Sequence, residues 1–113
     1  MRVIAKRTLI RFWETEPLSE QSLRAWHDEV RDAEWKTPNE LKTQFRTASV
    51  INQKRVVFNI HGNEYRLIVD IEYRLKIVFI VWVGTHKQYD KIDVKNVRNV
   101  ATDKKQKTIR RRA

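Results

Sequence analysis

The chain has 113 residues, of which 24 are basic and 14 acidic, and it contains no cysteine, so its formal net charge at pH 7 is +10. This length fits one domain with a modest core, and the lack of cysteine excludes disulfides and thiolate metal sites. No apolar run approaches the roughly 18 residues of a membrane span, and charges interrupt the apolar residues of the first segment. We therefore expect a cytoplasmic protein with no membrane contact and, from its charge, a polyanionic partner.

The first residues predict a strand and a helix. Residues 1–5 can form a short strand, after which Leu9, Ile10 and Trp13 recur at helical spacing. Pro17 cannot continue this helix and should end it.

A second helix is predicted to begin after Ser19, which we expect to be its N-cap. Leu23, Trp26, Val30 and Ala33 form its apolar stripe. The tryptophans of both helices fall on the stripes that must be buried, which indicates core positions for them.

A third, short helix has a clear start. Thr37 caps it, Pro38 takes the first position, and Glu40 completes a capping box. The polar residues 46–53 that follow predict a connection or a weakly formed strand.

Three consecutive antiparallel strands are predicted next. Residues 55–60 and 65–71 alternate apolar and polar side chains, and His61-Gly62-Asn63 supplies the tight turn between them. Residues 77–83 are apolar on both faces, which is typical of a central strand covered on each side.

A short C-terminal helix completes the prediction. Gly84 ends the last strand, and Thr85 with Gln88 makes a capping box, so the helix should begin at His86, with Tyr89 and Asp90 on the same face. The fold class is α+β: a small antiparallel-rich sheet with the N-terminal helices packed on one face. We expect one domain over residues 1–102 and a flexible tail over 103–113, where six residues are basic and one is acidic.

The residue types argue against a metal or cofactor site. The three histidines, His27, His61 and His86, lack ligand spacing, and two glycines cannot build a phosphate-binding loop. We therefore expect no metal and no cofactor.

Basic and proton-carrying side chains remain, and we expect them around one end of the sheet: Lys54, Arg55, Arg66, His86, Lys87, Tyr89 and Lys91. Metal-free cleavage of RNA needs a deprotonated 2′-OH, a stabilised phosphorane and a protonated leaving oxygen. Arg66 and Lys54 could supply the charge, while His86 or Tyr89 could move protons and Asp90 orient a partner. In the alternative interpretation Arg66 only pairs with Asp70 or Glu64, and Tyr89 is a packing contact.

Two strings resemble a known family. VFNIHGNEYRLIVDI (57–71) and VGTHKQYDKIDV (83–94) resemble the HigB-type toxins of bacterial toxin–antitoxin systems, a branch of the RelE superfamily. The resemblance implies a RelE-like fold and a metal-independent, ribosome-dependent mRNA endoribonuclease, a hydrolase that inhibits translation. It further implies neutralisation by a HigA-like antitoxin with a helix-turn-helix domain, and operator DNA binding only through the complex.

Position by position, the resemblance makes Arg66 the sheet arginine that contacts the scissile phosphate and places His86 and Tyr89 in the catalytic C-terminal segment. The RNA-binding candidates are Lys54, Arg55, Asn59, Lys87 and Lys91.

Two other function classes stay open. One is a non-catalytic RNA- or ribosome-binding module, which would not require the His86–Tyr89 pair. The other is a protein-interaction subunit that docks through a Val78-Ile80-Trp82 face.

Overall fold

A computed structural model describes residues 1–99, so the predicted boundary at 102 and the basic tail lie outside the described residues. Its elements follow in the order β1 (Arg2–Ile4), α1 (Lys6–Thr15), η1 (Pro17–Ser19), α2 (Glu20–Arg31), α3 (Pro38–Gln44), β2 (Ser49–Val50), β3 (Arg55–Ile60), β4 (Tyr65–Glu72), β5 (Ile77–Thr85) and α4 (His86–Tyr89). The predicted α+β class is confirmed.

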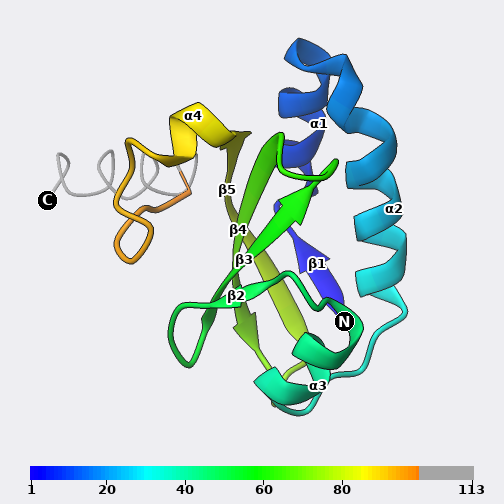
Figure 1. The fold of residues 1–113 in the computed structure, drawn as a ribbon. Coiled ribbons are helices and arrows are strands. Elements are labelled where there is room, and N and C mark those ends of the chain that lie inside the picture. Colours follow the sequence, from blue (N-terminus) through cyan, green and yellow to red (C-terminus); the bar gives the residue numbers. More distant parts are fainter. Residues whose placement is uncertain (100–113) are drawn as a thin grey trace, which may run out of the picture.

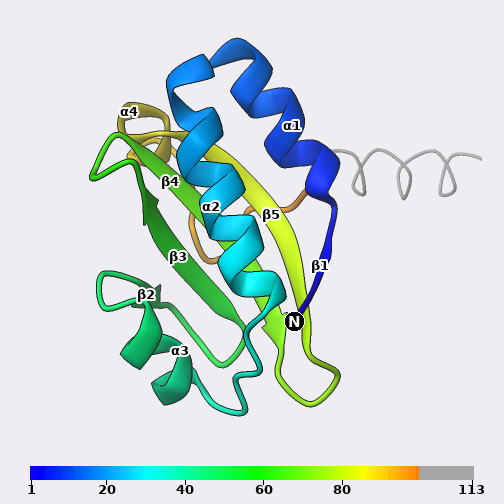
Figure 2. The same ribbon diagram turned by 90° about the vertical axis from the view of Figure 1, so that its right-hand side faces the viewer.

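The strands form one sheet in the order β1-β5-β4-β3-β2. All neighbours pair antiparallel except β1, which pairs parallel with β5. Helices α1 and α2 cover one face, whereas α4 and the chain that follows it lie on the other, as Figures 1 and 2 show. Strand β5 is therefore covered on both faces, as its continuous apolar run predicted.

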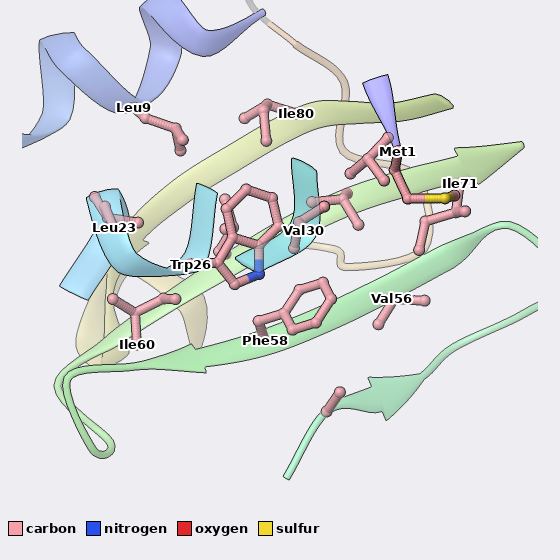
Figure 3. Packing of buried hydrophobic residues seen from close by; sticks show 14 of the residues in the cluster. Met1, Leu9, Leu23, Trp26, Val30, Val56, Phe58, Ile60, Ile71 and Ile80 are labelled. Carbon is pink, nitrogen blue, oxygen red and sulfur yellow. The ribbon is translucent and has the colours of Figure 1, made fainter. Parts of the chain in front are cut away.

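The main core lies between the two helices and the sheet (Figure 3). Trp26 of α2 packs edge-on against Phe58 of β3, with ring centroids 5.4 Å apart. The predicted alternation holds, since Phe58 and Leu67 contribute to this core whereas Asn59 and Arg66 face the other side. Both N-terminal tryptophans are buried, as predicted.

Helix α2 begins where it was predicted to begin, but Ser19 does not cap it as predicted. The helix begins at Glu20, but Ser19 makes no side-chain cap: its Oγ donates to the carbonyl of Glu16 at 2.7 Å. The chain instead enters α2 from the η1 turn begun by Pro17, so the backbone is already helical at Ser19. Thr37 does cap α3, because its side chain accepts a hydrogen bond from the Glu40 N–H.

A β-bulge in β5 changes which side chains share a face. Ile68 pairs with Trp82 while the next residue, Val69, pairs with Ile80, which leaves Val81 as the extra residue. Val81 and Trp82 consequently lie on the α4 side, whereas Ile80 belongs to the helix-side core. The predicted Val78-Ile80-Trp82 docking face is therefore wrong, because strict alternation does not hold across the bulge.

Candidate active site

The candidate site lies at the end of the sheet next to α4. In the strand register Asn59 of β3 is opposite Arg66 of β4, and Arg66 is opposite Gly84 of β5. Directly opposed residues project from the same face. The register thus brings a polar side chain, a cation and a glycine into one row under α4.

Arg66 is half-buried and directed at α4. Its Cζ lies 5.7 Å from the centroid of the Tyr89 ring, and its Nη1 donates to the carbonyl of Asn63 at 3.3 Å. A guanidinium over an aromatic face is an attractive contact of about 0.5–1 kcal/mol at exposed sites. Asp70, a partner considered for Arg66, pairs with Arg55 instead, so the guanidinium of Arg66 keeps charge available for a ligand.

Helix α4 holds the two proton carriers. Its predicted capping box is confirmed, because the Thr85 side chain accepts from the Gln88 N–H and the Gln88 side chain accepts from the Thr85 N–H. The His86 N–H also donates to the carbonyl of Glu64 in the β3–β4 turn at 3.0 Å. These bonds fix the direction in which α4 leaves β5 and so place Tyr89 over Arg66.

His86 and Asp90 form a pair on the exposed side of α4. His86 Nδ1 lies 3.2 Å from Asp90 Oδ2, and the two side chains are 47% and 59% exposed. The carboxylate can orient the imidazole, while Nε2 stays open to a ligand. The two residues are thus arranged as an oriented acid–base group beside Tyr89.

Two residues of the site, Trp82 and Gly84, were not predicted from the sequence to be site residues. Trp82 lies beside Tyr89 with ring centroids 6.3 Å apart, and its indole covers Gly84. A Cβ at Gly84 would lie 2.4 Å from the Trp82 ring. The available signal was the spacing, since residues 82 and 84 share a face in a strand and a glycine leaves room for a large neighbour.

The predicted RNA-binding residues divide into two groups. Asn59 is half-buried next to Arg66, and Lys87 and Lys91 are exposed on and just after α4, so these three border the site. Lys54 and Arg55 do not. They precede and begin β3, and the antiparallel register pairs Arg55 with Asp70, four residues along β4 from Arg66.

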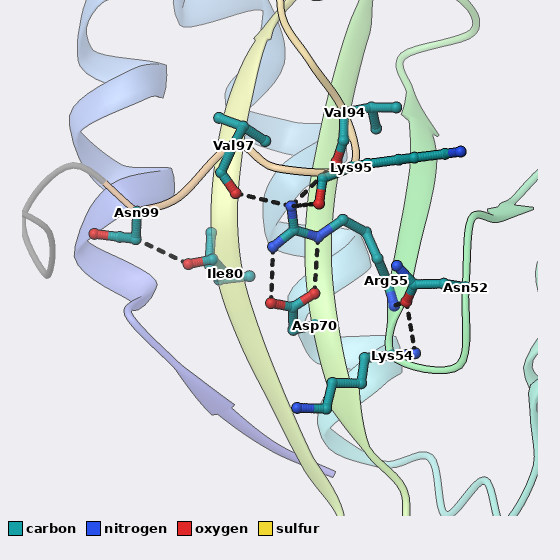
Figure 4. Close-up of polar contacts among 9 residues, drawn as sticks. All are labelled: Asn52, Lys54, Arg55, Asp70, Ile80, Val94, Lys95, Val97 and Asn99. Atoms are coloured by element: carbon teal, nitrogen blue, oxygen red, sulfur yellow. Dashed lines mark hydrogen bonds and ion pairs between the residues drawn. The ribbon is translucent and has the colours of Figure 1, made fainter.

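Arg55 is buried and paired with Asp70, so its surroundings are those of a structural residue. The residue is 8% exposed, and its guanidinium lies between Asp70 and main-chain carbonyls of the chain after α4, as Figure 4 shows. The correction has a simple physical reason: where the chain after α4 covers the sheet, a charged side chain must be paired to be buried.

Residues 1–99 contain no group of three or more His, Cys, Asp or Glu side chains that could hold an ion. Over the same residues, no helix combines the length and apolarity needed to cross a bilayer. What the site offers is a cation, a phenol and an oriented imidazole on an open surface, which suits stabilisation of a phosphate and transfer of protons.

The comparisons with known proteins agree with this chemistry. The model of the HigB toxin family, the RelE-like toxic component of a toxin–antitoxin system, matches residues 19–92. The mRNA interferase toxin HigB of Escherichia coli (strain K12) is 29% identical over 92 residues, which cover 80% of this chain and 88% of that protein. The mRNA interferases HigB of Escherichia coli O157:H7 and Shigella flexneri match at the same identity of 29%. The matched range includes Arg66, His86 and Tyr89.

Proposed function

Since the chain belongs to the HigB toxin family, the RelE-like toxic component of a toxin–antitoxin system, we propose that it is a metal-independent, ribosome-dependent mRNA endoribonuclease. The observation that supports this most strongly is the position of the Arg66 guanidinium, 5.7 Å from the Tyr89 ring and on the same open surface as the His86–Asp90 pair. A cation beside proton carriers is the minimum that RNA cleavage without a metal requires.

In the proposed reaction the 2′-oxygen of one nucleotide forms a bond to the adjacent phosphorus while the bond from phosphorus to the 5′-oxygen breaks. Arg66 stabilises the negative charge that builds on the equatorial oxygens. His86 and Tyr89 exchange protons with the attacking and leaving oxygens, and Asp90 orients His86 through its 3.2 Å contact. The products are a 2′,3′-cyclic phosphate and a 5′-hydroxyl.

The exposure of the site supports dependence on the ribosome. His86 is exposed and Arg66 and Tyr89 are only half-buried, so this surface does little to orient a flexible RNA chain by itself. Positioning is a large part of a catalytic rate, and a ribosome that already holds the message in a fixed conformation can supply it. Asn59, Lys87 and Lys91 are proposed to contact the RNA next to the scissile phosphate.

The partner that neutralises the toxin is proposed to be a HigA-like antitoxin with a helix-turn-helix domain. An open site can be shielded by a bound protein, and a chain with net charge +10 favours an acidic surface on that protein. Operator DNA would be bound only through the complex. Co-expression with a HigA-like antitoxin should restore growth, and the co-purified complex, but not the toxin alone, should bind operator DNA specifically.

The central experiment maps transcript ends after brief induction, on a translated message and on the same message without a start codon. Wild type should cut the translated message alone, and toxin that has been treated with EDTA and then desalted should cleave on ribosomes as fast as untreated toxin. Arg66→Ala should lower the cleavage rate about 100-fold or more, as the removal of one transition-state contact does elsewhere. Arg74→Ala, which removes an exposed arginine from the β4–β5 turn at the opposite end of the sheet, is the matched control.

Full cleavage by a folded Arg66→Ala protein would remove this residue from the mechanism. Equal cutting of translated and untranslated messages would contradict ribosome dependence. Growth arrest without any new transcript ends would instead support the non-catalytic ribosome-binding module.

A further inference from the structure

The chain after α4 crosses the second face of the sheet as a strap, which we define as residues 90–97 (Figure 1). It contains neither helix nor strand. Partly buried apolar side chains of the strap pack against a small cluster on the sheet formed by Val57, Ile68 and Val81. Because the strap has no regular hydrogen-bonded structure to hold it, its attachments to the sheet decide how firmly it lies there.

Among residues 1–99, the hydrogen bonds from the sheet to residues 90–97 come from the Arg55 guanidinium. Nη1 of Arg55 donates to the carbonyl oxygens of Val94 and Lys95, both at 3.1 Å, and of Val97 at 2.8 Å. Figure 4 shows the Arg55 side chain inserted between β4 and the strap. One side chain from β3 therefore collects three carbonyls that would otherwise lack a partner in the sheet.

Asp70 fixes the plane of that guanidinium. Its two carboxylate oxygens accept from Nε and Nη2 of Arg55, each at 2.9 Å, and the two side chains are 10% and 34% exposed. Such a bidentate pair sets orientation as well as charge, so Nη1 is left facing the strap. A lysine ammonium is a point charge and cannot bond the carboxylate on one edge and the strap on the other.

Hydrogen bonds of the Asp93 side chain hold a turn in the strap next to Arg55. The Asp93 carboxylate accepts from the Lys95 N–H at 3.2 Å and from the Asn96 side chain at 2.7 Å. The hydrogen bond from Asn96 lowers the pKa of Asp93, so the carboxylate stays charged in weak acid. The resulting turn brings the carbonyls of residues 94–97 to one point.

The strap continues directly from the helix that carries Tyr89. Helix α4 has only four residues, too few to be stable alone, and the Ile92 N–H donates to the Tyr89 carbonyl at 3.2 Å. The capping box holds the start of this helix and the strap holds its end. Loss of the strap would leave Tyr89 restrained from one side only.

We propose that Arg55 and Asp70 are positioning residues, which hold Tyr89 against Arg66 by fixing the strap to the sheet. This assignment rests on the proposed catalytic role of Arg66 and Tyr89. It also replaces the predicted RNA contact of Arg55 with a different role. The family match ends at residue 92, so the strap residues that accept hydrogen bonds from Arg55 lie beyond it.

The test uses Arg55→Lys and Asp70→Asn in the full chain, with Arg74→Lys as the matched control at an exposed arginine. Amide hydrogen exchange of residues 89–97 should rise at least tenfold in both variants, while the amides of β4 stay within twofold of wild type. NMR signals of the Tyr89 and Trp82 rings, which lie 6.3 Å apart, should shift. Cleavage on ribosomes should lose about tenfold or more in kcat with KM within twofold, as expected for a misplaced group.

Each outcome decides the matter. A raised KM with unchanged kcat and unchanged exchange would return Arg55 to RNA binding and overturn the positioning role. Unchanged strap exchange, or faster exchange with unshifted ring signals and full kcat, would overturn it as well. If wild type fails to cleave RNA, the proposed function fails, whereas exchange and ring signals still report whether Arg55 holds Tyr89 in place.

Discussion

Replacement of Gly84 by alanine is the sharpest test of how the site is built. Gly84 is in β5 with an ordinary φ, so alanine costs little in backbone conformation and only the added methyl group matters. That carbon would lie 2.4 and 2.5 Å from two atoms of the Trp82 ring and 2.8 Å from Oε1 of Gln88. The indole and the capping amide must both move for the variant to fold.

The size of the effect follows from these contacts. Carbon atoms prefer separations of about 3.5–4.0 Å, so the ring must shift by about 1 Å or more. Overpacking of this kind costs about 1–3 kcal/mol, and a weakened cap on α4 adds about 1 kcal/mol. We therefore expect Gly84→Ala to lose about 2–4 kcal/mol of unfolding free energy, which a domain with about 5–15 kcal/mol survives. Cleavage should fall as well, because Trp82 supports the Tyr89 ring.

Urea denaturation of Gly84→Ala, Trp82→Leu and the double variant shows whether the loss of unfolding free energy comes from the contact between the new methyl group and the Trp82 ring. If the methyl group collides with the indole, the two substitutions should couple by about 1–2 kcal/mol, with the double variant better than the sum. Gly62→Ala is the matched control: it has φ +65° and nothing within 4 Å of the new Cβ, so it pays only for backbone conformation and should keep activity. A Gly84→Ala protein with wild-type stability and cleavage would refute the reasoning.

Three further predictions concern stability. Burial, followed by the charge of Lys6, lowers the pKa of His27 below its ordinary value of 6.5. Its contribution to stability is therefore complete above pH 6.5 and is lost as the pH falls through the folded-state pKa. In His27→Gln the urea midpoint should change less between pH 8 and pH 5 than it does in wild type. Thr37→Ala should cost about 1 kcal/mol in the same assay, because it removes the acceptor of the Glu40 N–H. The Tyr73 hydroxyl is buried without a partner among residues 1–99, so Tyr73→Phe should hold or raise the thermal midpoint, and a clear drop would reveal a missed partner.

Much of the fold could be predicted because local signals agreed with tertiary packing. The side-chain cap at Thr37 and the capping box at Thr85 appear at the predicted helix starts, and the alternation through β3 and β4 gives the observed faces. Ser19 shows the limit of such signals. Its residue type favours a cap, but the preceding η1 turn made its backbone helical, and only the three-dimensional path of the chain reveals this.

The site was harder to predict than the fold. Arg66, His86 and Tyr89 are brought together by strand register and helix direction. The sequence predicted the antiparallel strands and the helix start at His86, but not the register. Arg55 was placed among them because it is basic and follows Lys54 at the start of the same predicted strand. Its surroundings depend on the segment around Val97, which comes about forty residues later and has no periodicity. No local sequence pattern predicts the hydrogen bond between Arg55 and the Val97 carbonyl.

The bulge at Val81 bears on how related chains should align. Because the extra residue is absorbed between Ile80 and Trp82, deleting it would keep the aromatic platform on the α4 side and restore uninterrupted pairing with β4. A one-residue gap at this point therefore does not change the side on which Trp82 lies, whereas a gap at Val83 would turn Trp82 and Gly84 to opposite sides. Relatives that differ in length within β5 should place their insertions and deletions here.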